Sequence, residues 1–166
     1  MQINLGRPLE IRRAGLADVP QLLVLYKLLD IEPEPEMPIE QACQRLLDLA
    51  SNPGHSIYVA EYGQVIVGTF ALIFVGGISH GARDSCIVED VVVAPELQGA
   101  GIGKQMMRFA MQKCAMRDCY KLVLSSHLKR NHAHQFYERL GFRKHGYSYL
   151  IDSFDDDGLS PAADGA

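Results

Sequence analysis

Apolar and polar positions follow two periods along this chain. Alternating or continuous apolar runs predict strands over residues 9–13, 56–61, 65–75, 87–93 and 121–126. Apolar residues three and four apart predict helices that start near Asp18, Ile39, Ile102 and Asn131. Residues 142–145 and 147–154 predict a closing hairpin around Gly146. The order β-α-α-β-β-β-α-β-α-β-β predicts an α/β fold, with a mixed sheet of six to seven strands flanked by about four helices.

Residue types at the ends of these segments refine the prediction. Asp18 is expected to cap the first helix, Asn131 is expected to cap the last one, and Gly141 is expected to end it. Residues 65–75 are apolar nearly throughout, so this strand is expected to be covered on both faces. The strand, helix and strand between residues 87 and 126 predict a βαβ unit with parallel strands.

Composition narrows the class of protein. The chain has 166 residues, a formal net charge of −4 and no dense basic stripe, which argues against a nucleic-acid partner. A single domain is expected over residues 1–154, followed by an acidic tail, residues 155–166, with a composition typical of disorder. The N-terminus has no apolar signal-peptide core, and no run of about 20 apolar residues occurs. A cytoplasmic location without membrane contact is therefore expected.

Cysteine and histidine spacing gives no metal site. The four cysteines form no C-x-x-C pair and share no metal-ligand spacing with the histidines. His132 and His134 do not share a helix face. No metal is therefore expected.

Glycines mark the junction between the fourth predicted strand and the third helix. The sequence from Gln98 to Lys104 reads Gln-Gly-Ala-Gly-Ile-Gly-Lys and opens directly into the helical pattern. The first amides of a helix lack internal partners and carry the positive end of its dipole, so they attract anions. Glycine lets the backbone approach a phosphate closely.

Two phosphate motifs do not fit this loop. Gly99 is one residue too close to the Gly103-Lys104 pair for a Walker P-loop, and Gln105 stands where that motif has Ser or Thr. Lys104 occupies the third glycine position of a dinucleotide fingerprint. What remains is Q-x-x-G-x-G, from Gln98 through Gly101 to Gly103. A tight turn without any ligand stays an alternative on the loop alone.

The chain resembles the GNAT superfamily of N-acetyltransferases in two motifs. The first is Q-x-x-G-x-G, a variant of R/Q-x-x-G-x-G/A, and the second is Asn131-x-x-x-x-Phe136-Tyr137-x-x-x-Gly141-Phe142. The resemblance extends over residues 9–154 and implies the GNAT fold, with acetyl-CoA as co-substrate. It implies that the pantetheine arm pairs with the backbone of the central strand and that the diphosphate lies on the glycine loop. The cofactor-binding residues that it implies are Val91, Val92, Val93, Gln98, Gly99, Ala100, Gly101, Ile102, Gly103, Lys104, Asn131 and His134.

Two residues are candidates for catalysis. The resemblance makes Tyr137 the general acid that protonates the departing sulfur, while a core tyrosine on a helix face is the alternative. Glu89 is the candidate general base, either directly or through water, because an alkylammonium with a pKa of about 10.4 must lose a proton before it attacks. A period of two places Glu89 on the face of Val91 and Val93. The alternative for Glu89 is an edge carboxylate paired with Arg83 or Lys121.

The resemblance implies acetyl transfer to a primary amine of a small molecule or a protein. A non-catalytic sensor of acyl-CoA is the alternative, and an NTP-binding protein is a third hypothesis. Glu32, Glu34 and Glu36 lie on a proline-rich stretch, where they either attract a cationic amine or form a solvated loop. A homodimer is a further expectation.

Overall fold

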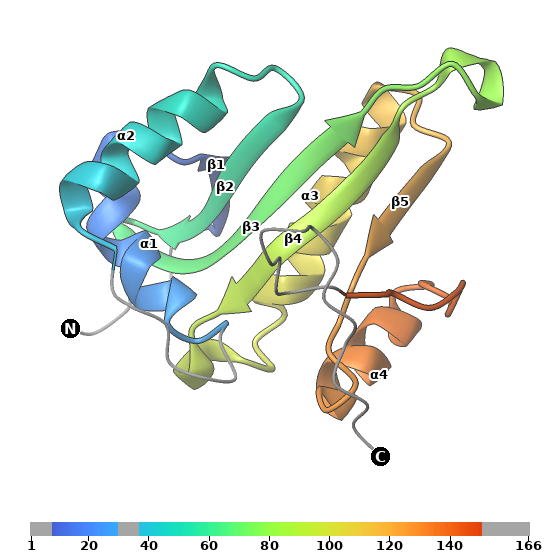
Figure 1. The fold of residues 1–166 in the computed structure, drawn as a ribbon. Coiled ribbons are helices and arrows are strands. Elements are labelled where there is room, and N and C mark those ends of the chain that lie inside the picture. Colours follow the sequence, from blue (N-terminus) through green and yellow to red (C-terminus); the bar gives the residue numbers. More distant parts are fainter. Residues whose placement is uncertain (1–7, 30–36, 151–166) are drawn as a thin grey trace, which may run out of the picture. The chain divides into compact units, whose positions relative to one another are not determined.

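The computed structural model describes residues 8–29 and 37–150. They belong to two compact units, one ending at Leu124 and one beginning at Ser125. The first unit contains a sheet and three α-helices, and the second contains one α-helix (Figure 1). The strands are β1 (Glu10–Arg13), β2 (His55–Tyr62), β3 (Val65–Val75), β4 (Ser85–Val93) and β5 (Lys121–Leu124). The helices are α1 (Val19–Tyr26), α2 (Ile39–Ala50), α3 (Ile102–Met116) and α4 (Asn131–Arg139).

The sheet has the order β1-β2-β3-β4-β5, with antiparallel neighbours from β1 to β4. The last pair, β4 and β5, is parallel, and α3 connects its two strands. This confirms the predicted βαβ unit and the mixed α/β class. The prediction for residues 65–75 is also confirmed along most of the strand, because every residue from Ile66 to Leu72 is buried.

The two faces of the sheet are covered by different helices. Directly paired residues share a face, so Tyr58, Phe70 and Leu72 lie on one side of the sheet. Phe109 of α3 packs there, with its ring centroid 5.0 Å from that of Tyr58. The predicted apolar face of α3 is buried as well, at Ile102, Met106, Ala110 and Cys114. We call this side the α3 face (Figure 1).

The opposite side, which we call the α1 face, is covered by α1. Leu22 and Leu25 of α1 form one apolar cluster with Val59 of β2 and Val92 of β4. Polar contacts also hold α1 to the sheet, because the Gln21 side chain accepts a hydrogen bond from the Ile66 amide at 2.9 Å. The core of the first unit therefore lies on both sides of β3 and β4.

Asp18 precedes α1 as predicted, but its side chain does not cap that helix. It instead accepts a 2.7 Å hydrogen bond from the Gly15 amide and a bidentate pair of hydrogen bonds from Arg12, at 2.7 and 2.9 Å. The Arg12 guanidinium, more than the backbone contact, holds the pKa of this buried carboxyl below its usual range. The prediction that Asp18 caps the first helix is thus wrong, because the Arg12 guanidinium of β1 binds its carboxylate instead.

The closing hairpin is the main departure from the predicted fold. Residues 142–150 form no strand, and residues 151–154 lie outside the described part of the chain. The sheet of the described residues therefore has five strands rather than six or seven. Tyr147 and Tyr149 are 90% and 91% exposed. The predicted hairpin is therefore not formed over residues 142–150, in keeping with the marginal stability of an isolated hairpin in water. The single-domain expectation for residues 1–154 stays a prediction.

None of the described helices combines the length and the apolar character needed to cross a lipid bilayer.

Gly68 of β3 allows α3 to approach the sheet closely, and its replacement is expected to destabilise the fold. A Cβ at this position would lie 2.9 Å from the Met106 sulfur and 3.0 Å from the Val92 carbonyl oxygen. Gly68→Ala should lower the free energy of unfolding by about 1–3 kcal/mol, as overpacking of a core does. Urea unfolding measures this change. Gly77→Ala is the control, because its Cβ would meet only Ser79 Oγ, at 3.8 Å. Equal stabilities of the two variants would contradict the packing argument.

Candidate active site

A β-bulge interrupts β4 where the site was predicted. Ala71 pairs with Glu89 and Thr69 pairs with Val92. Between these pairs β3 has one residue, Phe70, whereas β4 has two residues, Asp90 and Val91. Asp90 adopts a φ of 54°, a left-handed conformation that Asp tolerates better than most residues. The extra residue changes which side chains of β4 share a face.

The bulge corrects the predicted orientation of Glu89. Glu89 pairs with Ala71 and Val92 pairs with Thr69, so both side chains lie on the α1 face. Val93 pairs with Gly68 and belongs to the α3 face. The prediction that Glu89 and Val93 share a face is therefore wrong. It assumed that side chains alternate strictly along β4, and the extra residue at the bulge breaks this alternation.

The second half of β4 has an open side. The parallel ladder between β4 and β5 ends at the pair Val88 and Leu124. β5 itself ends at Leu124, so within the described sheet residues 89–93 pair with β3 alone (Figure 1). Backbone groups along the other edge of these residues are available to an extended ligand, in the manner of an added strand.

The glycine loop follows directly from this open edge. Gln98 fastens the loop to the strand, because its side-chain amide donates a 3.1 Å hydrogen bond to the Val93 carbonyl. Gly99 and Gly101 have φ values of 86° and 84°, which favour glycine over other residues. Gly101 is the residue just before α3. The loop thus turns sharply from the end of β4 into the first turn of that helix.

Most amides of this loop have no acceptor among the described residues. Within the described residues, no hydrogen bond is donated by the amides of Gly99, Gly101, Ile102, Gly103 or Lys104. Ala100 differs, because its amide donates to the Leu97 carbonyl at 3.2 Å. The free amides stand at the positive end of a 15-residue helix, beside the exposed Lys104 side chain. This arrangement suits an anion.

Glu89 lies in an environment that disfavours its charge. Burial raises the pKa of its carboxyl, and the neighbouring Asp90 raises that pKa further. Among the described residues, Glu89 forms no ion pair with Arg83 or Lys121. The structure therefore contradicts the alternative of an edge carboxylate paired with one of these cations. A carboxylate with a raised pKa is suited to accept a proton.

Tyr26 lies near Asp90 of the candidate site, and the sequence did not indicate this. Its hydroxyl is buried on the α1 face and forms no hydrogen bond with the described residues. Burial raises its pKa to about 12, the nearby Thr69 hydroxyl opposes this shift, and the charge of Asp90 adds to it. No signal in the sequence joins residue 26 to residue 90, because only the fold brings them close together.

The second unit carries the remaining predicted residues on α4. Asn131 is the first residue of this helix and forms no side-chain capping bond, so the predicted N-cap is wrong by one position. His134 Nε2 lies 3.0 Å from the His127 carbonyl oxygen. The Tyr137 ring packs between Phe136 and Phe142, with centroid distances of 5.1 and 5.7 Å. Gly141 ends the helix as predicted, with a φ of 94°.

The structure brings together one part of the predicted site in each unit. In the first unit Glu89, Val91, Val92 and Val93 lead directly into residues 98–104. In the second unit Asn131, His134 and Tyr137 share the short helix α4. Glu32, Glu34 and Glu36 lie outside the described residues. No group of three His, Cys, Asp or Glu side chains in the described ranges is arranged to hold a metal ion.

Comparison with known proteins gives the class of this chain. The model of the acetyltransferase (GNAT) family matches residues 21–142. This match covers well over half of the sequence, and the chain therefore belongs to the acetyltransferase (GNAT) family. The resemblance of the two sequence motifs to this family is confirmed.

Individual relatives agree with this class. A glucosamine 6-phosphate N-acetyltransferase of Trypanosoma brucei brucei is 37% identical over 87 residues, which make up 52% of this chain and 57% of that protein. An aminoalkylphosphonate N-acetyltransferase of Salmonella typhimurium is 29% identical over 62 residues, 37% of this chain and 40% of that protein. The chain thus matches about half the length of these curated relatives.

The fold is shared over a longer stretch. A solved acetyltransferase structure from Trypanosoma brucei has a TM-score of 0.76 and 29% sequence identity. The superposition covers 88% of this chain and all of that one. The two proteins therefore share their overall fold over most of this chain.

The raised pKa of Glu89 predicts a pH-dependent effect on stability. The unfolded chain ionises this carboxyl at a lower pH than the folded protein does. The folded state therefore loses stability as the pH rises from the ordinary carboxyl pKa through the raised pKa. Glu89→Gln removes this loss. Its free energy of unfolding, relative to wild type, should be higher at pH 7 than at pH 3, as measured by urea unfolding.

The matched control for this experiment is Glu96→Gln, which removes an exposed carboxylate soon after β4. A Glu89→Gln difference that stays constant between the two pH values would show that the folded protein does not perturb Glu89.

Proposed function

We propose that this protein transfers an acetyl group from acetyl-CoA to a primary amine. The observation that carries the proposal is the open edge of β4, which leads into a loop of unpaired amides. The edge offers backbone partners to an amide-containing chain, and the loop offers donors to a diphosphate. Pantetheine and diphosphate are joined in that order in acetyl-CoA. Family membership and the named N-acetyltransferases among the relatives support the proposal.

The open edge would hold the pantetheine arm through backbone groups of Val91 and Val93. The diphosphate would lie on the amides of Gly99 and of residues 101–104, with Lys104 adding a positive charge. Holding the two reactants in this way removes much of the entropic part of the activation barrier, up to roughly 7–11 kcal/mol in well-oriented systems. An amide near Val91 would stabilise the oxyanion that develops as the amine attacks.

Glu89 would accept the proton of the attacking ammonium group, either directly or through a water. Its raised pKa supports this role, because a carboxylate with a pKa nearer neutrality is a stronger proton acceptor. The amine nitrogen then bonds to the thioester carbon, and the carbon–sulfur bond breaks. Tyr137 would donate its hydroxyl proton to the departing sulfur, as the family motif implies.

The names of the relatives suggest a class of acceptor. Glucosamine 6-phosphate and aminoalkylphosphonates are both small amines that carry an anionic phosphorus group. We infer that the acceptor here is a small amine of this kind rather than a protein amine. The cytoplasmic location and the homodimer stay predictions from the sequence.

A non-catalytic acyl-CoA sensor is less well supported, because a sensor needs neither a perturbed carboxylate beside the open strand edge nor a tyrosine at the motif position. Thiol release from acetyl-CoA separates the two hypotheses. Glucosamine 6-phosphate, 2-aminoethylphosphonate and an alkylamine lacking phosphorus form a first panel of acceptors. Release only with the phosphorus-bearing amines would support the acceptor class, and tight acetyl-CoA binding without release from a broad panel would favour the sensor.

Gly101→Glu should abolish CoA binding, because a carboxylate would project from the loop that is proposed to hold the diphosphate. A Cβ at this residue meets no atom within 4 Å, so the protein itself tolerates the added volume. The control is Gly101→Ala, which shares the strain of a positive φ but adds no charge. Calorimetry should show much weaker CoA binding for the Glu variant than for the Ala variant. Equal affinities would refute the assignment of the loop.

Tyr137→Phe should lower turnover about 10²–10⁴-fold, the usual contribution of a general acid, with little change in CoA affinity. Steady-state thiol release and calorimetry measure the two quantities. Tyr147→Phe removes an exposed hydroxyl of the same unit and serves as the control. An unchanged rate at neutral and at high pH would exclude Tyr137 as the acid.

A further inference from the structure

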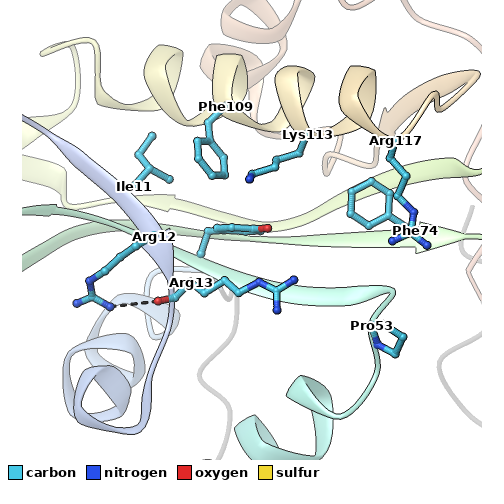
Figure 2. A pocket seen from close by; sticks show the side chains of 9 residues that line it. Ile11, Arg12, Arg13, Pro53, Phe74, Phe109, Lys113 and Arg117 are labelled. Carbon is cyan, nitrogen blue, oxygen red and sulfur yellow. Dashed lines mark hydrogen bonds between the residues drawn. The ribbon is translucent and has the colours of Figure 1, made fainter.

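The α3 face has a pocket of about 440 Å³ that the proposed reaction does not use. It lies between α3 and the strands β1, β2 and β3 (Figure 2). Aromatic and cationic side chains dominate its lining, among them Tyr58, Phe74, Phe109, Arg13, Lys113 and Arg117. Among the described residues, no aspartate or glutamate lines it. The pocket therefore combines apolar walls with an excess of positive charge.

Two of its cations lack a counter-ion. In the part of the chain that the structure describes, neither Arg13 nor Lys113 takes part in an ion pair. Lys113 is half-buried, with its Nζ 5.0 Å from the centre of the Phe109 ring. Figure 2 shows Lys113 extending from α3 and Arg13 extending from β1. These two charges are concentrated locally in a chain whose formal net charge is −4.

The other two arginines of this region are already paired. Arg117 donates a 2.7 Å hydrogen bond to Asp84, and its guanidinium carbon lies 4.6 Å from the centre of the Phe74 ring. Arg12 also contributes to the lining of the pocket, but its side chain is already paired with Asp18 and Glu61. Asp84 holds Arg117 in place, whereas Arg13 and Lys113 supply charge without compensation.

The pocket lies on the other side of the sheet from Glu89. Arg13 pairs with Tyr58, which pairs with Phe70, so Arg13 belongs to the α3 face. Glu89 pairs with Ala71, the neighbour of Phe70 along β3, and belongs to the α1 face. A ligand in this pocket is therefore separated from Glu89 by the sheet itself.

We propose that this pocket is a second binding site, which takes a small phosphomonoester attached to an aromatic or apolar body. A phosphomonoester carries close to two negative charges at neutral pH, which matches the two uncompensated cations. Arginine and lysine donate charge-assisted hydrogen bonds to its oxygens. The rings of Phe74, Phe109 and Tyr58 give the apolar body a surface to cover. The ligand of this pocket is distinct from the amine that receives the acetyl group.

Calorimetry on the full chain tests the proposal with phenyl phosphate as the probe. Phenyl phosphate should bind at least tenfold more tightly than inorganic phosphate, because only the former covers the aromatic walls. Benzyl alcohol, which has the ring without the charge, should show no measurable binding. The affinity for phenyl phosphate should be unchanged when CoA is present at saturation, because the two sites are separate.

Variants locate the binding. The double variant Arg13→Gln/Lys113→Gln should weaken phenyl phosphate binding at least tenfold, since it removes both uncompensated charges. The affinity for CoA and the thermal midpoint should stay at the wild-type values, because neither residue forms an ion pair with the described residues. Arg45→Gln, an exposed position on α2, is the control for a lost positive charge.

Three results would overturn the second site. They are equal binding by the double variant and wild type, displacement of phenyl phosphate by CoA, and no binding of phenyl phosphate at all. Displacement by CoA would show that the probe occupies the coenzyme site. None of these results contradicts the acetyltransferase proposal. A failure of CoA to bind would contradict that proposal but not the proposal of a second site.

Discussion

The extra residue in β4 is the constraint on which the rest of the site depends. Asp90 takes a left-handed conformation and shifts the register between β3 and β4. This shift sends Glu89 and Val92 to the α1 face and Val93 to the α3 face. It falls just past the last pair of the β4–β5 ladder, where β5 ends. The side-chain orientations and the open backbone edge thus change within a few residues of the strand.

Local chemistry explains which features of the sequence could be predicted. The glycine loop, the apolar face of α3 and the parallel βαβ unit follow from residue types and spacings that can be recognised within single segments of the sequence. The bulge does not, because Asp90 and Val91 fit an alternating strand as well as an interrupted one. The partner of Asp18 was missed for a similar reason. An aspartate before a helix suggests a cap, but only the fold brings the Arg12 guanidinium to its carboxylate.

The sheet separates two kinds of electrostatic environment. On the α1 face, the charge of Asp90 acts on both the Glu89 carboxyl and the buried Tyr26 hydroxyl, which disfavours additional negative charge there. On the α3 face, Arg13 and Lys113 stand beside aromatic rings without a carboxylate partner among the described residues. The sheet therefore separates one face on which a carboxyl group has a raised pKa from another face whose cations suit an anion.

The buried hydroxyl of Tyr26 has a consequence for motion. A buried polar group without a partner costs about 1–3 kcal/mol, and hydration of the hydroxyl would recover that free energy. A local opening of α1, an eight-residue helix that packs on the sheet through one apolar cluster and the Gln21 contact, would admit water to this hydroxyl. Such an opening would uncover the side of β4 that carries Glu89. The helix that covers the buried hydroxyl thus also covers the carboxylate that is proposed to accept the proton of the amine.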